Sequence, residues 1–291
     1  MIKEAVKKTQ LYLEMIKFEH SIFALPFAYL GMLMAAEGLP EFFDFLWISA
    51  AMVSFRSMAM GANRLIDRAI DAANPRTSNR ALPARKLKTP FVLGLTILFL
   101  VFFEYSAYRL GDLCFRLSPI PVLMAWLYPW MKRFTWLSHM LLGMILGIAP
   151  YGAWLAVRGE FSWIPGFFLI GVTCWVAGFD IVYALQDLAF DKQYGLYSFP
   201  ARFGEKNSLR LTFLLHVIAF AAWFGAGWLA GLGTAYWIGL VVVAGLLVRE
   251  HWLVRNFGVA KIQEAFFLMN AVVSVALFLS VLADFSVRGW L

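Results

Sequence analysis

The feature that most constrains this chain is a series of long apolar stretches. A helix that crosses a bilayer needs about 20 mainly apolar residues, and stretches of that kind recur along the sequence. Of the 291 residues, 62% are hydrophobic and 15% are charged, whereas soluble domains carry about 25% charged residues. We therefore predict an all-α polytopic membrane protein, a single domain over residues 1–291 with nine transmembrane helices in a bundle around a central intramembrane cavity. The predicted spans are residues 18–37, 43–63, 91–108, 112–130, 137–157, 164–187, 211–230, 233–249 and 264–284.

The N-terminal segment, residues 1–17, is charged and amphipathic, and it contains Lys3, Lys7, Lys8 and Lys17. This pattern predicts a helix that lies on the membrane surface. The apolar run that follows it is longer than the core of a signal peptide, so no cleavable signal peptide is expected.

The formal net charge is +7, and a basic chain can be a nucleic-acid binder. Here the basic residues sort by membrane side instead, because alternate loops hold most of them. By the positive-inside rule, the N-terminus and the basic loops are cytoplasmic and the C-terminus is external, in a multi-pass protein of the cell membrane. The expected surrounding is a lipid bilayer, and no nucleic acid is expected as a partner. The basic side comprises the N-terminus and the connections near 72–90, 131–136, 192–210 and 249–262, and the opposite side holds Arg109, Arg116, Arg158 and Arg288.

Cysteine and histidine offer little chemistry in this sequence. Cys114 and Cys174 both fall in predicted spans, and the four histidines show no ligand spacing. Neither a disulfide framework nor a zinc site is expected.

Two predicted spans carry carboxylates at or inside their cytoplasmic ends, where burying an unmatched charge is costly. On the second span, a regular helix places the polar residues Arg56, Asn63, Asp67 and Asp71 within a wedge of roughly 80°. The sixth span ends with a similar stripe on one helix side. Its members are Asp180, Tyr183, Asp187 and Asp191.

Oxygen ligands one turn apart on two helices suit a hard divalent cation, and Mg²⁺ fits best. Because Mg²⁺ is usually completed by water and substrate phosphates, the implied ligand is a phosphate or diphosphate. Two Mg²⁺ ions are expected. The predicted metal ligands are Asn63, Asp67, Asp71, Asp187 and Asp191.

Each acidic stripe is followed by a basic loop, one at about 72–90 and the other at about 192–210. Arginine forks and hydroxyl groups can hold diphosphate oxygens. The residues expected to do so in these loops are Arg76, Arg80, Lys192, Ser198 and Arg202, and Tyr183 of the second stripe is also expected to bind the substrate.

Each stripe also has an interpretation without a function, because Asp beside Lys or Arg at a helix end is often a solvated ion pair. For one stripe alone, that interpretation is as good as a functional one. The repetition of matched stripes, each with its basic loop, favours a functional site. Arg56 lies inside the second span on the acidic face, and it either neutralises these carboxylates or binds the carboxylate of a substrate.

These motifs resemble the UbiA-type intramembrane prenyltransferases over nearly the whole chain. That family carries N-x-x-x-D-x-x-x-D on its second helix, here Asn63, Asp67 and Asp71, followed by R-T-x-x-R, here Arg76, Thr77 and Arg80. Its second motif resembles the stretch from Asp180 to Asp191, with Tyr183-Ala184 and Asp187 inside it. The stretch 128–135 resembles the Y-P-x-x-K-R segment of members that prenylate hydroxybenzoate and related ring acids, which adds Lys132 and Arg133 as substrate-binding candidates.

Two positions depart from the family pattern. Arg64 stands where many members have an additional Asp, and Arg85 stands where a Gly commonly closes the first motif. The segment 20–27 and the sequence around Asn63 are similar to those of a 4-hydroxybenzoate polyprenyltransferase-like branch. That branch also includes enzymes of an alternative menaquinone route that act on dihydroxynaphthoate.

The resemblance implies transfer of a polyprenyl group from polyprenyl diphosphate to a ring carbon of a small aromatic acid, in ubiquinone or menaquinone biosynthesis. The residues expected to be catalytic are Asp67 and Asp187, which would anchor Mg²⁺ under the diphosphate, and Asp180, which would orient the acceptor hydroxyl or take a proton. Other acceptors within the family, such as haem, chlorophyllide or a glycerophosphate lipid, form the alternative. A cation-coupled secondary transporter also places carboxylates in the membrane, and a nonenzymatic scaffold is the remaining hypothesis.

Overall fold

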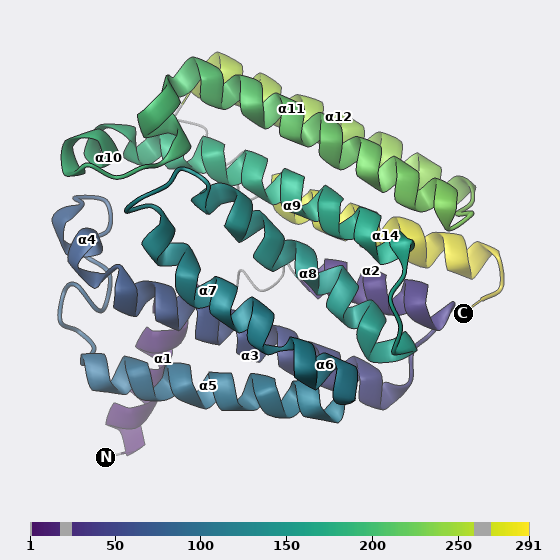
Figure 1. The fold of residues 1–291 in the computed structure, drawn as a ribbon, viewed down its shortest axis with the longest axis horizontal. Helices are drawn as coiled ribbons and strands as arrows, with labels where there is room; N and C mark the ends of the chain where they lie inside the picture. Colours follow the sequence, from purple (N-terminus) through teal and green to yellow (C-terminus); the bar gives the residue numbers. More distant parts are fainter. Residues whose placement is uncertain (1, 18–24, 259–268, 291) are drawn as a thin grey trace.

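The computed structural model describes residues 2–17, 25–258 and 269–290, and the described residues form helices joined by turns, with no strands. The predicted all-α class is confirmed (Figure 1). The helices are α1 Ile2–Met15, α2 Leu25–Ala36, α3 Phe42–Ile66, α4 Arg68–Ala73, α5 Thr89–Arg109, α6 Asp112–Leu117, α7 Pro119–Met131, α8 Ser138–Arg158, α9 Trp163–Ala184, the 3₁₀ turn η2 Leu185–Asp187, α10 Leu188–Tyr194, α11 Phe199–Leu229, α12 Thr234–Phe257 and α14 Asn270–Val287.

Seven helices of the described part are long and apolar enough to cross a membrane, so the predicted count of nine is not confirmed. The predicted fourth span is two short helices, α6 and α7, because Ser118 separates them and Pro119 starts a new helix. For the first predicted span, the structure describes only the 12-residue helix α2, since residues 18–24 lie outside the described part. The beginning of the ninth predicted span, residues 264–268, also lies outside it.

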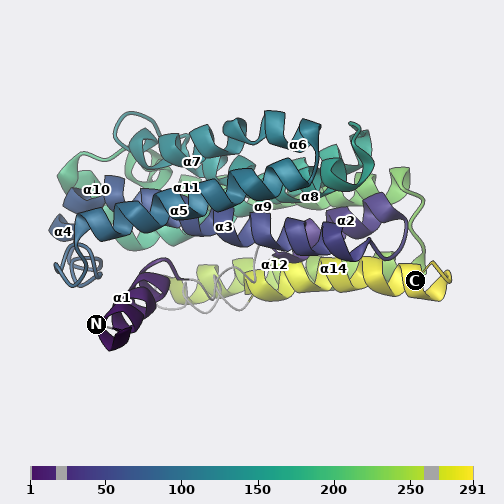
Figure 2. The same cartoon turned by 90° about the horizontal axis from the view of Figure 1, so that it is seen from below.

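The long helices run side by side along the molecule (Figure 1). The short helices α4 and α10 lie together at one end, and the C-terminus lies at the other. Seen from below in Figure 2, α12 and α14 lie on one side of the bundle, and α6 and α7 lie on the opposite side. This arrangement brings the ends of both predicted acidic stripes to the same end of the molecule.

Small residues let the central helices approach closely, as expected for packing in a membrane. A Cβ atom added at Gly143 on α8 would lie 2.2 Å from the Thr173 carbonyl oxygen on α9. Beside this contact, large aromatic rings fill the core. The ring centroids of Phe27 and Trp175 lie 5.3 Å apart, and those of Trp175 and Trp223 lie 6.2 Å apart.

Helix α1 packs against the bundle on one face. Tyr12 is fully buried, and its hydroxyl donates to the Ser57 carbonyl of α3 at 3.3 Å. Ile16, just after α1, is also buried, in a cluster with Leu82 and Val92. A location of the remaining α1 surface in the headgroup layer stays a prediction.

A cavity of about 450 Å³ lies among α3, α5, α6, α7 and α8, as predicted for the intramembrane bundle. Its walls are almost entirely apolar, and the polar side chains that line it include Arg56, Asn63 and Tyr128. Along α3 the lining extends from Asn63 back to Ile48, a rise of roughly 22 Å at 1.5 Å per residue. The cavity is therefore elongated and begins beside the first acidic motif.

Candidate functional site

Each acidic motif contains a break in the helix at its central carboxylate. Asp67, with φ −88° and ψ 4°, separates α3 from α4. Asp187, with φ −102° and ψ 5°, ends η2 and precedes α10. The expectation that each stripe lies on one regular helix is wrong, because both segments adopt the same bridge-region conformation at these residues. Active-site residues are often found in this sparsely populated region.

Asp67 is matched by the Y-P-x-x-K-R segment that follows α7. Lys132 Nζ donates to Asp67 Oδ2 at 2.5 Å, and a guanidinium nitrogen of Arg133 lies 3.7 Å from Oδ1. The carboxylate is almost fully buried, and its Oδ1 has no hydrogen-bond partner within the described residues. Burial raises the pKa of Asp67, although the ammonium of Lys132 opposes that rise. A buried, incompletely paired oxygen is thus available to a further ligand.

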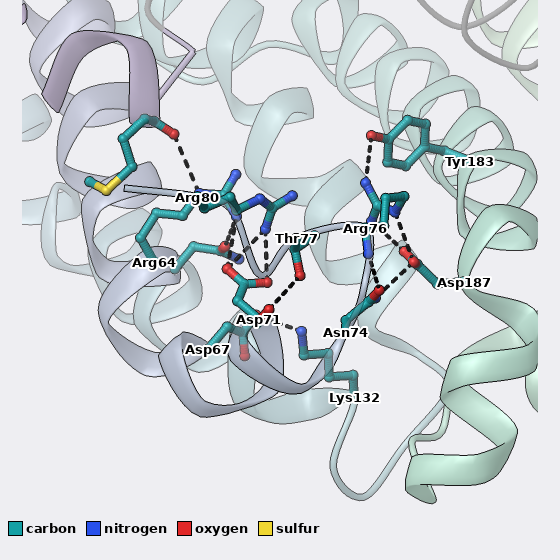
Figure 3. Close-up of polar contacts among 12 residues, drawn as sticks. Arg64, Asp67, Asp71, Asn74, Arg76, Thr77, Arg80, Lys132, Tyr183 and Asp187 are labelled. Carbon is teal, nitrogen blue, oxygen red and sulfur yellow. Dashed lines mark hydrogen bonds and ion pairs between the residues drawn. The ribbon is translucent and has the colours of Figure 1, made fainter. Parts of the chain in front are cut away.

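Asp71 is held by the first basic loop. Arg80 Nη1 donates to both Asp71 oxygens, at 2.8 and 2.9 Å, and Arg64 lies 3.7 Å away (Figure 3). The Thr77 hydroxyl donates to the Asp71 backbone carbonyl at 2.9 Å. The R-T-x-x-R loop therefore folds back on α4. Arg64, where many family members have a carboxylate, instead adds a cation, and its Nη1 also donates to Asn63 Oδ1 at 3.3 Å.

Asp187 joins the two motifs across more than a hundred residues of chain. Asn74 Nδ2 donates to Asp187 Oδ1 at 2.9 Å, and the Arg76 guanidinium forms a two-pronged pair with the same carboxylate. Arg76 Nη1 also donates to the Tyr183 hydroxyl at 3.3 Å (Figure 3). Burial by itself lowers the pKa of Arg76, but its hydrogen bonds and charge attraction to Asp187, together with its contact with Tyr183, outweigh burial and raise the pKa. Asp187 thus contacts the loop that follows the first motif, and Asn74 is a partner that the sequence did not single out.

The second basic loop contributes unevenly. Ser198 is buried and caps α11, where its hydroxyl accepts from Ala201 N at 3.4 Å. Lys192 and Arg202 are exposed, and within the described part of the chain neither is seen in an ion pair with the site carboxylates. Their contact with a diphosphate stays a prediction. The structure also shows that α11 begins inside the predicted loop.

Asp180 lies apart from these ion pairs and contacts a histidine. His139 Nδ1 lies 2.7 Å from Asp180 Oδ2, and the Phe199 backbone N–H donates to His139 Nε2 at 3.3 Å. Sequence reasoning missed His139, because a single histidine at the start of an apolar helix carries no spacing signal. Asp180 therefore lies outside the ion pair of Asp187, and its role toward the acceptor stays a prediction.

The carboxylates fit Mg²⁺ by chemistry, although they do not form a protein cage. Within the described residues, no group of three or more His, Cys, Asp or Glu side chains converges on a metal position. The acids instead contact cations: Asp67 contacts Lys132, and Asp71 contacts Arg80. Hard oxygen donors and the unbonded Asp67 Oδ1 nevertheless suit Mg²⁺, which keeps water and phosphate ligands. The assignment of the five ligands stays a prediction.

Comparison with known proteins settles the family. Residues 24–272 match the model of the UbiA prenyltransferase family. The chain belongs to the UbiA prenyltransferase family. This membership confirms the resemblance and argues against the transporter and scaffold hypotheses. Among curated UbiA-family relatives, the 4-hydroxybenzoate octaprenyltransferases of Tolumonas auensis and Vibrio cholerae are 30% and 31% identical over 223 and 228 residues. These alignments cover 77% of this chain in both cases, and 78% and 79% of the relatives.

Solved UbiA homologues share the architecture. The apo structure of a UbiA homologue from Aeropyrum pernix K1 is 29% identical, with a TM-score of 0.84 over 92% of this chain and 98% of the homologue. A UbiA homologue from Archaeoglobus fulgidus bound to GPP and Mg²⁺ is 17% identical, with a TM-score of 0.68 over 93% and 99% of the two chains. Because its sequence identity is low, the similarity to the A. fulgidus structure establishes the fold alone.

Proposed function

We propose that this UbiA-family protein transfers a polyprenyl group from polyprenyl diphosphate to a ring carbon of a small aromatic acid, in a Mg²⁺-dependent step of respiratory quinone biosynthesis. The acceptor is of the 4-hydroxybenzoate or dihydroxynaphthoate kind. The observation that carries the proposal is the junction at Asn63, where a cluster of paired acids and bases meets the elongated apolar cavity. A substrate with an anionic head and a hydrocarbon tail matches both parts. The printed names of the curated relatives support the aromatic acid.

The polar cluster is assigned to the diphosphate. Arg76, Arg80, Lys132 and Arg133 already stand beside carboxylates, so they can turn to diphosphate oxygens without leaving the site. Mg²⁺, held by Asn63, Asp67 and Asp71 on one side and by Asp187 and Asp191 on the other, would neutralise the charge that develops on the departing pyrophosphate. The UbiA homologue of A. fulgidus, solved with GPP and Mg²⁺, supports this ligand pair.

The apolar cavity is assigned to the prenyl tail. Burial of the tail removes apolar surface from water, and a dry cavity protects an allylic cation from quenching by water. Arg56 lines this cavity seven residues before Asn63 on α3. It either balances the acids of the site or binds the carboxylate of the acceptor.

The chemical step breaks the carbon–oxygen bond to the diphosphate and forms a bond to a ring carbon of the acceptor. Pyrophosphate leaves with the electron pair, and loss of the ring proton restores aromaticity. Asp180 is assigned to orient the acceptor hydroxyl or accept a proton, because it lies outside the ion pairs of Asp67, Asp71 and Asp187.

An acceptor panel tests the proposal. Purified protein is incubated with radiolabelled prenyl diphosphate, Mg²⁺ and one acceptor at a time: 4-hydroxybenzoate, dihydroxynaphthoate, haem, chlorophyllide or glycerol phosphate. We expect a prenylated product with a hydroxylated aromatic acid. A product with haem, chlorophyllide or the glycerophosphate alone would overturn the acceptor class, and release of pyrophosphate without a prenylated product would overturn the transfer.

We also propose that the acid-base end faces the cytoplasm of a cell whose inner or plasma membrane contains the protein. The helix ends near Arg109, Arg116, Arg158 and Arg288 lie away from the basic loops, which supports this orientation. Reporter fusions at residue 80 and at the C-terminus should report opposite sides. The same side for both would overturn the orientation.

A further inference from the structure

The buried His139 connects three helices at the inner edge of the site. It lies in the first turn of α8, its Nδ1 contacts Asp180 of α9, and its Nε2 contacts the backbone of Phe199 at the start of α11. The imidazole is 6% exposed, whereas the Asp180 side chain is 17% exposed. Asp180 thus keeps part of its side chain exposed, while the histidine is enclosed by protein.

The two contacts select one form of the imidazole. A backbone N–H can only donate, so His139 Nε2 must carry a lone pair to accept the Phe199 N–H. In a neutral imidazole the other nitrogen then carries the proton. His139 Nδ1–H therefore donates to Asp180 Oδ2, and that oxygen is fixed as an acceptor. An imidazolium would lose the Phe199 bond, because both of its nitrogens are donors.

We propose that His139 is a positioning residue, which fixes the Asp180 carboxylate so that it meets the hydroxyl of the aromatic acceptor. The inference rests on the proposed function and on the assignment of Asp180 to the acceptor. Through Phe199, the same imidazole is tied to the first residue of α11.

The segment before His139 strengthens this link. The backbone carbonyl of Lys132 accepts from the Tyr197 N–H at 2.7 Å, while the Lys132 side chain contacts Asp67. Trp136 also packs edge-on against Phe199, with ring centroids 5.5 Å apart. Residues 132–139 thus contact the segment 197–199, where α11 begins, at two points.

Two substitutions separate hydrogen bonding from packing. A glutamine in place of His139 would offer an NH₂ donor group and a carbonyl acceptor, whereas a phenylalanine would fill the space without either. We expect His139→Phe to lower kcat for the aromatic acid at least about tenfold, in the range found for groups that orient a functional ligand, with the KM for prenyl diphosphate within about twofold of wild type. We expect His139→Gln to recover kcat to within about threefold of wild type, since it restores both bonds.

His251→Phe is the matched control, because this histidine lies on α12 and contacts His216 instead of the site. Its turnover should equal that of wild type. Wild-type kcat in His139→Phe would overturn the inference, as would an equal loss of kcat in folded His139→Phe and His139→Gln.

A double-mutant cycle with Asp180→Asn tests whether His139 acts through Asp180. The double variant His139→Phe/Asp180→Asn should be no slower than the slower single variant. Losses that multiply would show independent roles and overturn the inference. Undiminished turnover in Asp180→Asn would overturn it too, while prenyl transfer by the wild type would stand.

A readout without substrate separates these failures from failure of the proposed function. In ¹⁵N-histidine spectra of the protein in detergent, the signal that disappears in His139→Gln should be that of a neutral ring protonated at Nδ1. A ring protonated at Nε2 would overturn the inference, whatever the acceptor proves to be.

Discussion

At the residue scale, Asp67 and Asp187 share a backbone conformation and a way of being stabilised. Each carboxylate receives a cation from a distant segment, Lys132 in the first case and Arg76 in the second. Removing one partner of a buried pair leaves an uncompensated charge, which is costly. The two positions are therefore sensitive to substitution for two reasons, lost ligands and lost pairing.

We expect Asp67→Asn and Asp187→Asn to lower prenyl transfer by on the order of 10²-fold or more, because each removes charge that must neutralise the leaving group. Turnover and membrane extraction are measured in parallel. Asp112→Asn is the matched control, since Asp112 is exposed at the opposite end and pairs with Arg116; its activity should stay at the wild-type level. Wild-type turnover in Asp67→Asn or Asp187→Asn would contradict the assignment.

The donor atoms also predict the metal dependence. Carboxylate and amide oxygens favour Mg²⁺ or Mn²⁺ over softer ions. Transfer should stop in excess chelator and return when Mg²⁺ or Mn²⁺ is added back. Full activity in excess chelator, with removal of the metal confirmed by elemental analysis, would refute the metal role.

Sequence motifs revealed the acids but not all of their partners. Asn63, Asp67 and Asp71 stand at helical spacing, so they could be recognised from the chain alone. Asn74 and His139 could not, since their contacts with Asp187 and Asp180 depend on how distant helices pack. Side chains that act through tertiary contacts leave no local pattern.

At the element scale, the length of the apolar stretches predicted the positions of the seven long helices. It did not predict where the helices break. Pro119 is a visible cause of the α6–α7 break. The break at Asp67 has no proline or glycine to mark it, and the hydrogen bond from Asp71 N to Asp67 O continues across it at 2.8 Å. Lys132, which pairs with Asp67 at this break, comes from a distant segment, so the local sequence does not reveal the contact.

Helix packing gives a stability prediction. Gly143→Ala places a Cβ against the Thr173 backbone of α9, so we expect a loss of about 1–3 kcal/mol, typical of overpacking. Gly94→Ala on α5 is the control, because a Cβ there meets nothing within 4 Å. Thermal unfolding in detergent should show a lower midpoint for Gly143→Ala only. Equal midpoints would mean that α8 and α9 are not packed as described.

At the scale of the whole molecule, an apolar cavity adjoins a charged end. The cavity should limit the length of the prenyl tail that the protein accepts. Ala153 of α8 lines it, well beyond the site end at Ser138. We expect Ala153→Phe to lower kcat/KM for a long prenyl diphosphate about tenfold or more relative to geranyl diphosphate, since small volume changes in an apolar pocket have effects of this size. Ala221→Phe, on an exposed face of α11, should leave the ratio unchanged. An unchanged ratio in Ala153→Phe would contradict the assignment of this cavity to the prenyl tail.

The internal ion pairs of the site have a thermodynamic consequence for ligand binding. A diphosphate that binds Arg76 and Arg80 would leave Asp187 and Asp71 without their ion-pair partners. A cation that binds the two acids would likewise leave the two arginines unpaired. Binding of both together is an exchange of partners, in which every buried charge stays matched. The metal and the diphosphate should therefore increase each other's affinity by the same factor, because such coupling is reciprocal. The protein would then take up its substrate as a metal complex, and its own salt bridges would keep these charges paired until that complex arrives.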